Sequence, residues 1–206
     1  MPQTAEAHPQ AVVPSYYDDL NASFDHAWLL ISRGVRDRRS PFHTPTLATI
    51  DADGAPEART IVLRGASRDT ATLRFHTDRR SHKPAELLQD PRCSVHVYDA
   101  AAKIQVRLRG KSALHGEGDV ADMAWNGSQP RSRVCYTQAA APGATLRSPE
   151  AIVAHAPIDL AAARNNFAVI LMSIAEMEWL YLSHLGHRRA LWTRDGATWQ
   201  GRWLAP

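Results

Sequence analysis

The sequence predicts a mainly β protein, an antiparallel barrel with peripheral helices. Short runs of alternating apolar and polar residues recur along the chain, turn residues separate them, and few are joined by a segment with helical periodicity. A doubly wound α/β sheet would need a helix between successive strands, so that class does not fit. A chain of 206 residues with 44% hydrophobic content can bury a sizeable core, and we expect one domain over residues 15–206.

The N-terminal part of the chain is expected to be a tail followed by a covering helix. Residues 1–14 are rich in Pro, Ala and Gln and are predicted to be disordered. From Tyr16, apolar residues recur at three- and four-residue steps and predict an amphipathic helix that ends near Ser40-Pro41. The stripe consists of Leu20, Phe24, Trp28, Ile31 and Val35.

A hairpin follows this helix. Residues 46–50 alternate as a strand, Asp51-Ala52-Asp53-Gly54 forms a turn, and the second arm runs from Arg59 to Arg64. A metal loop at this turn is excluded because its remaining carboxylate positions are missing. In the second arm, Ile61 and Leu63 are predicted to lie on one face.

The next segment predicts an anion site at a helix start. Residues 65–69 form a turn, 72–77 return as a strand, and Ser81 is placed as the N-cap of a helix that Asp90-Pro91 ends. Free backbone N–H groups and basic side chains would together make a seat for a phosphate. The basic side chains are Arg59, Arg79, Arg80 and Lys83. The alternative is that these residues only form a solvated surface.

Two more strands and a helix follow. Val95 and Val97 share one face of a strand over residues 93–98, and residues 104–111 alternate in the same way. Residues 117–125 are predicted to form a short helix, which Asn126-Gly127 interrupts. Short strands at close spacing support the barrel.

The C-terminal third is predicted to hold a long loop and the closing strands. Residues 131–156 contain Pro, Gly and Ser signals and form a loop with a helical turn at 149–154. Asp159 caps a brief helix that runs through Asn165. Residues 167–182 form a long strand or a bulged pair, and residues 189–203 form the closing hairpin.

The net charge and the two cysteines restrict the classes of function that fit this chain. The formal net charge of +3 suits an anionic ligand but is too small to argue for nucleic acid. Cys93 and Cys135 have no metal-ligand spacing, and we expect reduced thiols and no metal site. With neither a signal sequence nor a membrane span in sight, the expected location is the cytoplasm.

The motifs from about residue 45 onward resemble, in their order and spacing, the pyridoxamine 5′-phosphate oxidase family. Its members bind FMN on a split β-barrel with Greek-key topology. The resemblance lies in Arg-Thr-Ile-Val-Leu-Arg at 59–64, Ser81-His82-Lys83, Ile-Gln-Val-Arg-Leu-Arg-Gly at 104–110 and the closing Arg-Trp-Leu-Ala-Pro. Ile104 stands where the family has Arg. Because the substrate residues also depart from the family pattern, most of all at Leu185, the chain looks closer to a divergent FMN-binding branch.

The resemblance implies a cofactor site. Arg59, Ser81 and Lys83 would hold the FMN phosphate, while Gln105 would reach the flavin across a homodimer. Arg189 would lie near the pyrimidine end of the flavin ring, ten residues after Trp179 as in the family. The implied FMN-binding residues are Arg59, Thr60, Ile61, Val62, Leu63, Arg64, His76, Thr77, Ser81, His82, Lys83, Gln105, Trp179 and Arg189.

The implied substrate site departs from the family pattern. The family's Lys is Arg64, its Tyr is Trp125, and its next phosphate-binding Arg falls at Gln129 or is displaced to Arg131 or Arg133. The family's late Arg-x-His becomes Leu185-Gly186-His187, which removes one substrate contact. The implied substrate residues are therefore Arg64, Trp125, Arg133 and His187.

The sequence thus predicts an FMN-dependent oxidoreductase that transfers hydride between a small substrate and FMN. Its predicted partners are that small molecule and a second copy of the chain, with FMN at the subunit interface. The alternative, motivated by Leu185, is a split barrel that binds a flavin without turnover. A nucleic-acid-binding barrel ranks last, because aromatic content is only 7% and no base-stacking motif is visible.

Overall fold

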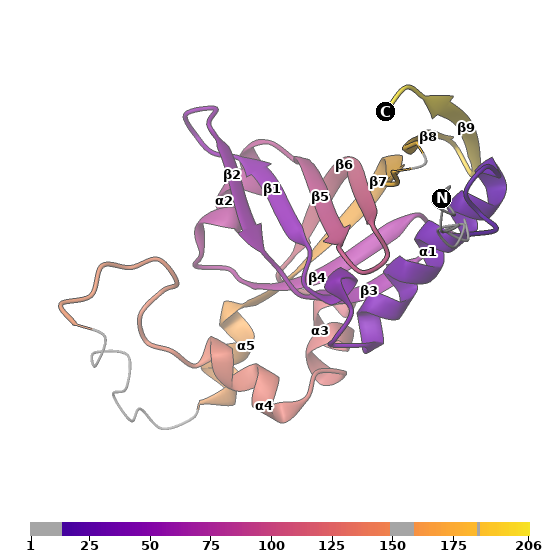
Figure 1. Ribbon diagram of the computed structural model, residues 1–206. Helices are drawn as coiled ribbons and strands as arrows, with labels where there is room; N and C mark the ends of the chain where they lie inside the picture. The colour runs from indigo at the N-terminus through magenta and orange to yellow at the C-terminus, as the bar shows by residue number, and fades with distance from the viewer. Residues whose placement is uncertain (1–13, 149–158, 185) are drawn as a thin grey trace, which may run out of the picture.

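A curved antiparallel sheet is the centre of the computed structural model, which describes residues 14–148, 159–184 and 186–206 (Figure 1). Three sequence predictions lie outside the described residues. They are the disordered tail, apart from Pro14, the helical turn at 149–154, and the role of Leu185.

The described strands form one sheet in which every pair is antiparallel. The order is β2-β1-β5-β6-β7-β4-β3, and β8 joins β7 to β9. The strands are β1 (Thr46–Ile50), β2 (Pro56–Thr60), β3 (Leu63–Ser67), β4 (Thr72–Asp78), β5 (Arg92–Asp99), β6 (Ile104–His115), β7 (Phe167–Tyr181), β8 (Arg188–Asp195) and β9 (Thr198–Leu204). The predicted fold class, a mainly β split barrel, is confirmed, and the sheet is not closed.

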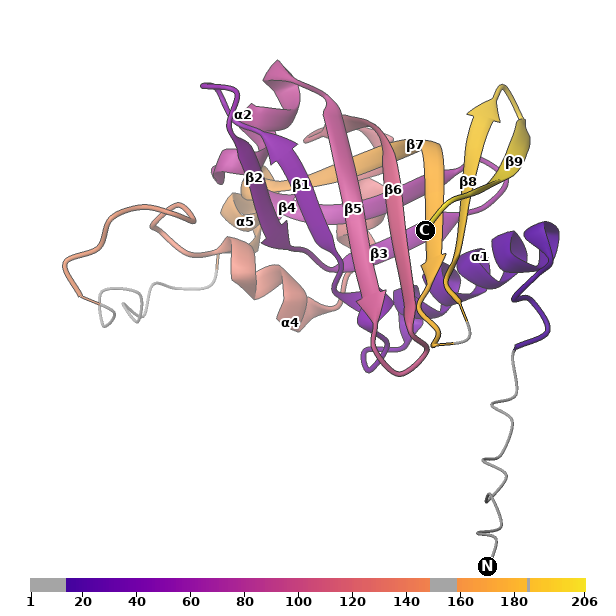
Figure 2. The ribbon, with the colours of Figure 1, turned by 45° about the horizontal axis from the view of Figure 1, so that its top comes forward.

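The long strand β7 organises the sheet. One edge pairs with β6, while the other pairs with β4 near Phe167 and with β8 near Tyr181. Figure 2 shows β2, β1, β5 and β6 side by side with β4 crossing behind them. The register of β6 and β7 shifts at Gly110, where a Cβ would lie 1.9 Å from the carbonyl oxygen of Ser173. A side chain therefore does not fit at this bulge.

The predicted strand over residues 59–64 is wrong in one respect. The chain leaves β2 at Thr60 and enters β3 at Leu63, so Ile61 and Val62 lie between two strands. The strand is interrupted because its two halves have different partners: β2 pairs with β1, whereas β3 pairs with β4. The predicted turn at 65–69 is corrected for the same reason, because Gly65–Ser67 belongs to β3. Ile61 and Leu63 are both buried, as expected.

The helices cover the sheet at two places. They are α1 (Leu20–Arg36), η1 (Pro41–His43), α2 (His82–Gln89), α3 (Asp119–Asn126), α4 (Pro130–Arg133), η2 (Val134–Tyr136) and α5 (Leu160–Asn166). The N-cap Asp19 accepts a hydrogen bond from the Ala22 amide at 2.9 Å, which explains why α1 begins at Leu20 and not at Tyr16. Figure 1 shows α1 beside β3 and the shorter helices α3, α4 and α5 together below the sheet.

Two apolar clusters follow from this arrangement. The main core lies between α1 and the sheet and includes Trp28, Phe75 and Leu108, all buried. A smaller cluster joins α3 and α5 to the start of β7, where Trp125 and Phe167 meet at a centroid distance of 5.3 Å. The smaller cluster fixes α3, which borders the second of the two cavities described next.

Candidate functional site

A cavity of about 420 Å³ lies between the β1–β2 hairpin and the start of α2. We call it the anion seat. It is lined by Asp51, Glu57, Arg59, Ser81, His82, Lys83, Glu86, Pro142 and Gly143. The structure thus brings together three residues predicted to hold a phosphate, Arg59, Ser81 and Lys83, and places His82 beside them.

Ser81 occupies the N-cap position of α2, as predicted, but its side chain does not cap the helix. Its hydroxyl donates to the carbonyl of Asp78 at 2.8 Å and accepts from the Lys83 ammonium at 3.1 Å. Thr77 is buried beside it, with 3.4 Å between the two hydroxyl oxygens. Because no side chain caps the first turn, its backbone N–H groups remain available to an anion.

Lys83 is the main cation of the anion seat. Burial and the neighbouring guanidinium of Arg59 lower the pKa of Lys83, while Glu86 and Asp78 act in the opposite direction. The lowered pKa means that the ammonium is incompletely solvated and incompletely neutralised. A bound anion would relieve both costs.

Arg59 is already engaged by the protein. It hydrogen bonds to the buried carboxylate of Glu86 at 2.9 and 3.2 Å and donates to the Thr49 hydroxyl. Thr49 in turn donates to Glu86 at 2.5 Å. Arg59 is therefore held in place by Glu86, and an anion would share its remaining N–H groups.

Two of the predicted basic residues point elsewhere. Arg80 pairs with Asp78 at 2.8 Å and donates to the carbonyl of Gln138, and Arg79 pairs with Glu117 at 3.6 Å. The prediction that both contribute to the seat is wrong, because local carboxylates and a loop carbonyl hold them.

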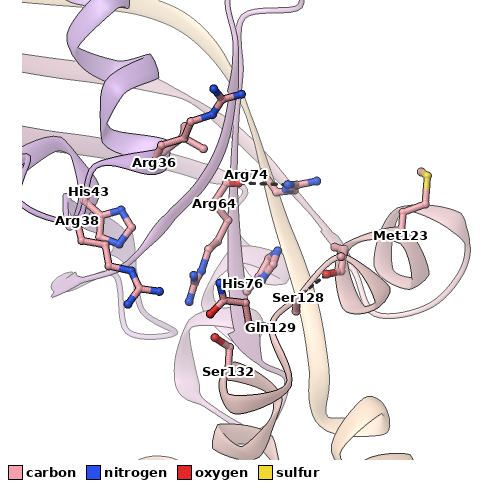
Figure 3. A pocket seen from close by; sticks show the side chains of 13 residues that line it. Arg36, Arg38, His43, Arg64, Arg74, His76, Met123, Ser128, Gln129 and Ser132 are labelled. Carbon is pink, nitrogen blue, oxygen red and sulfur yellow. Dashed lines mark hydrogen bonds between the residues drawn. The ribbon is translucent and has the colours of Figure 1, made fainter.

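A second cavity, of about 360 Å³, lies between the end of α1, strands β3 and β4, and the α3–α4 segment. We call it the arginine pocket, because Arg36, Arg38, Arg64 and Arg74 all line it. Figure 3 shows Arg36, Arg38 and His43 on one side, and Gln129 and Ser132 on another. Of the residues predicted for cofactor or substrate, the pocket contains Arg64 and His76.

His76 is a half-buried neutral group at this pocket. Burial, Arg64 and Arg74 together lower the pKa of His76 to about 4. Its ring meets Phe167 edge to face at a centroid distance of 4.9 Å, and no described residue hydrogen bonds to its buried Nε2 atom. At neutral pH the imidazole therefore carries no charge, and the cations of the pocket are the arginines.

The shifted pKa of His76 predicts a pH-dependent stability. Between pH 4 and 6.5 the unfolded chain binds the extra proton, so the free energy of unfolding rises with pH across this window. The expected contribution is about 2–3 kcal/mol between pH 4.5 and 7.5. Urea titrations of the wild type and His76→Gln measure it. The exposed His82→Gln is the control, and equal pH slopes for the wild type and His76→Gln would contradict the assignment.

The other predicted substrate residues lie around the pocket or away from it. Trp125 is buried in the smaller cluster, and the Arg133 guanidinium stacks on its ring at 5.2 Å while donating to the Asn126 carbonyl. Neither side chain lines the pocket, although Gln129 does. His187 is exposed at the β7–β8 connection, where its Nδ1 accepts from the Ser183 amide at 3.1 Å.

The anion seat, as the described residues form it, is not lined by Gln105 or Arg189. Gln105 lies on β6 opposite Leu180 of β7, and strands β1 and β5 stand between β6 and β2, which ends beside Arg59. Arg189 donates to Glu178 at 3.0 Å and shares that carboxylate with Arg107 at 2.6 Å.

Glu178 is held in place by ion pairs with Arg107 and Arg189. Burial opposes its ionisation, but hydrogen bonds from Arg189 and Arg107 outweigh burial and hold the pKa of Glu178 below its ordinary value. Trp179 points to the opposite face of β7 and is fully buried, with Tyr181 stacked beside it at 6.1 Å. Trp179 and Arg189 thus do not share a face, and the single chain leaves no surface of Trp179 for a flavin.

Sequence reasoning missed Glu86 in the seat and Arg36, Arg38 and Arg74 in the pocket. Alternation along β4 puts Arg74 and His76 on the face opposite Phe75, and this pattern could have predicted that Arg74 lies beside His76. The other positions depended on which helix packs over which strand, and the sequence alone contains no such information.

Within the part of the chain that the structure describes, no three His, Cys, Asp or Glu side chains are placed to hold a metal ion. Over the same residues, no helix has both the length and the apolar character needed to cross a bilayer.

The fold is a split β-barrel, and basic side chains line both of the cavities described above. Residues 25–116 match the family described as "Pyridoxamine 5'-phosphate oxidase, FMN-binding domain". The match confirms the sequence resemblance to the pyridoxamine 5′-phosphate oxidase-like FMN-binding split-barrel family over this segment, which is 92 of the 206 residues of the chain. The matched segment contains seven of the nine residues that line the anion seat and seven of the thirteen that line the arginine pocket.

Curated relatives match over part of their length. The pyridoxine/pyridoxamine 5′-phosphate oxidase of Thermobifida fusca is 35% identical over 106 residues, which are 52% of this chain and 44% of that protein. The enzyme of the same name from Azorhizobium caulinodans is 36% identical over 90 residues, 42% of each chain. The chain therefore matches less than half of each of these relatives.

Two solved structures share the fold over nearly the whole chain. One is a pyridoxamine 5′-phosphate oxidase-related, FMN-binding protein from Nostoc punctiforme, with a TM-score of 0.73, 24% identity, and coverage of 95% of this chain and 100% of that one. The other is PhzG from Burkholderia lata, solved with tetrahydrophenazine-1-carboxylic acid, with a TM-score of 0.72, 24% identity, and coverage of 95% and 98%. At this identity the likeness establishes the fold.

Proposed function

We propose that the chain binds FMN with its phosphate in the anion seat and acts as an FMN-dependent oxidoreductase on a small anionic substrate. One observation carries the proposal: the Lys83 ammonium bonds to Ser81 at the uncapped start of α2, inside the matched FMN-binding segment. A phosphate dianion fits a helix N-terminus that also offers a hydroxyl and an ammonium.

The residues present fit the proposed group. Lys83 and the first-turn amides of α2 offer donors, Ser81 offers a hydroxyl, and Arg59 offers the N–H groups that Glu86 and Thr49 leave over. Bound FMN would supply the two-electron redox chemistry. The chain would supply the phosphate site and a second cavity, the arginine pocket, lined in part by β3 and β4 of the same domain.

A second candidate function is flavin binding without turnover. It is favoured by the position of Trp125 and Arg133, two of the residues implied for the substrate. These side chains pack against each other and do not line the arginine pocket. Such a protein would hold FMN in the seat but would catalyse no electron transfer to a second compound.

The absorbance spectrum of the purified protein tests both candidates. With added FMN, we expect the resolved flavin bands of a bound chromophore after gel filtration, and a protein that stays colourless would end both proposals. Rapid bleaching of bound FMN by NAD(P)H or by an amine, followed by recovery of the bands in air, distinguishes the oxidoreductase from the non-catalytic binder. Free FMN at the same concentration is the control.

We also infer a homodimer in which Gln105 and Arg189 of one copy approach the FMN of the other. The inference is supported by their absence from the described lining of the anion seat and by their place on the face of the sheet that carries Glu178. Light scattering of the purified chain with and without FMN tests the oligomeric state.

A further inference from the structure

We infer that Glu86 is a positioning residue of the anion seat, whose buried carboxylate, together with the Thr49 hydroxyl, orients the Arg59 guanidinium toward a bound phosphate. This role rests on the proposed function only in taking that phosphate to be the one on FMN. Glu86 acts through Arg59 and not by contact with the ligand. A buried carboxylate on the wall of a cavity lined by basic residues calls for such a role, because its negative charge would otherwise weaken the binding of an anion.

Helix α2 places Glu86 one turn after Lys83. The side chain of Glu86 is 8% exposed, and both of its carboxylate oxygens accept from Nη2 of Arg59, at 2.9 and 3.2 Å. Thr49, buried on β1, donates to the same carboxylate at 2.5 Å and accepts from Nη1 of Arg59. The three side chains thus form a triangle of hydrogen bonds that joins β1, β2 and α2.

This triangle fixes two of the three nitrogen atoms of the guanidinium. A guanidinium carries five N–H groups in one plane, so holding Nη1 and Nη2 also sets the direction of the others. Among the described residues these are the hydrogen bonds of the Arg59 side chain, so the Nε–H and the second N–H of Nη1 remain for an anion. Ordering a flexible Arg side chain on binding weakens affinity. Because Arg59 is ordered before the ligand arrives, that loss is avoided.

The negative charge of Glu86 acts in the opposite direction, since a carboxylate repels a phosphate. Its oxygens, however, are already engaged by Arg59 and Thr49. Glu86 also supports the second cation of the seat. Burial and Arg59 lower the pKa of Lys83, while Glu86 and Asp78 raise it and so favour the charged ammonium. We therefore expect the positioning of Arg59 to outweigh the repulsion.

Glu57 does not have this role, although it lines the same cavity. Its carboxylate lies 3.6 Å from Nη2 of Arg59, which is beyond hydrogen-bond distance, and its side chain is 49% exposed. An exposed carboxylate at this distance contributes little and fixes no orientation. Of the two carboxylates beside the guanidinium, only the buried one can orient it.

The affinities for FMN and riboflavin, two flavins that differ by the phosphate group, test this role. The dissociation constant of riboflavin divided by that of FMN, measured by fluorescence quenching with the full chain, reports the contribution of the phosphate. A general loss of structure weakens both flavins and leaves this ratio unchanged. Glu86→Ala is expected to lower the ratio roughly tenfold or more. Glu86→Gln keeps an oxygen acceptor for Arg59 in a side chain of the same shape and should retain the ratio within about threefold.

Thr49→Val tests the triangle without removing a charge. It replaces the hydroxyl that accepts from Nη1 of Arg59 by a methyl group and should lower the ratio roughly threefold. Asp25→Ala is the matched control and should leave the ratio unchanged. It removes an exposed carboxylate that pairs with Arg68 at 2.5 Å and lines neither cavity.

Three outcomes would overturn the positioning role. They are a wild-type ratio in Glu86→Ala and Thr49→Val, a higher ratio in Glu86→Ala, and an equal loss in Glu86→Ala and Glu86→Gln. The last two would mean that the charge of Glu86 and not its hydrogen bonds is decisive. If circular dichroism shows that Glu86→Ala does not fold, the other two variants decide. A lowered ratio in Thr49→Val with a retained ratio in Glu86→Gln supports the role, and any other combination overturns it.

Phenyl phosphate separates this role from the proposed function, because it is a phosphate monoester without a flavin ring. Its affinity for the same variants is measured by calorimetric titration. Binding of phenyl phosphate that Glu86→Ala and Thr49→Val weaken, without any binding of FMN, would refute only the proposed function. Binding of FMN with an unchanged ratio in these variants would refute only the role of Glu86. The absence of binding by both compounds would refute both.

Discussion

Lys83→Ala should lower the affinity for FMN on the order of 100-fold, because a charge-assisted hydrogen bond to a phosphate contributes about 2–3 kcal/mol. Lys83 is the cation of the anion seat that is bonded only to a neutral hydroxyl, at 3.1 Å. Arg59, in contrast, is shared with Glu86. Quenching of FMN fluorescence on titration with protein measures the effect.

The controls for this variant isolate the charge of the seat. Lys111→Ala removes the same charge from an exposed position on β6 and should leave FMN affinity unchanged. Ser81→Ala should weaken binding roughly tenfold, since it deletes the hydroxyl and the partner of Lys83. Wild-type affinity in Lys83→Ala would show that the phosphate, if FMN binds at all, is held elsewhere.

Gly110→Ala should destabilise the protein by at least about 3 kcal/mol. The added Cβ would lie 1.9 Å from the carbonyl oxygen and 2.9 Å from the carbonyl carbon of Ser173. Both atoms belong to the backbone of β7, so no flexible side chain can move aside. Relief would require β6 and β7 to separate at the register shift, inside a pairing that runs from Ile104 to His115.

The measurement is the free energy of unfolding from urea denaturation monitored by circular dichroism. Gly127→Ala is the matched control, because its φ of −76° suits any residue and its Cβ would come no closer than 3.2 Å to the Met123 carbonyl. The control should change stability by less than about 1 kcal/mol. A similarly small change for Gly110→Ala would mean that the bulge can accept a methyl group.

The elements of the fold were predictable from the sequence where local patterns determined them. Alternation located β1, β5 and β6, and Asp159 marked the start of α5, where it accepts from the amides of Ala161 and Ala162. Residues 59–64 were misassigned as one strand because a period of two persists through Ile61 and Leu63. Only the change of pairing partner, which is not a local property, separates β2 from β3.

Of the two cavities of the candidate site, only the anion seat could be predicted from the sequence. The order of Arg59, Ser81 and Lys83 located the anion seat, because all three lie in or beside elements that pack at one end of the sheet. The arginine pocket was not foreseen. Arg36 and Arg74 are far apart in sequence, and their proximity depends on how α1 crosses β3 and β4.

The two cavities are built from separate pieces of the chain. Hairpin β1–β2 and helix α2 form one, while the end of α1, strands β3 and β4 and the α3–α4 segment form the other. Replacing side chains around the second leaves the first intact. Under the proposed function, proteins of this architecture can therefore diverge in the compounds they accept while the residues that hold the flavin phosphate stay the same.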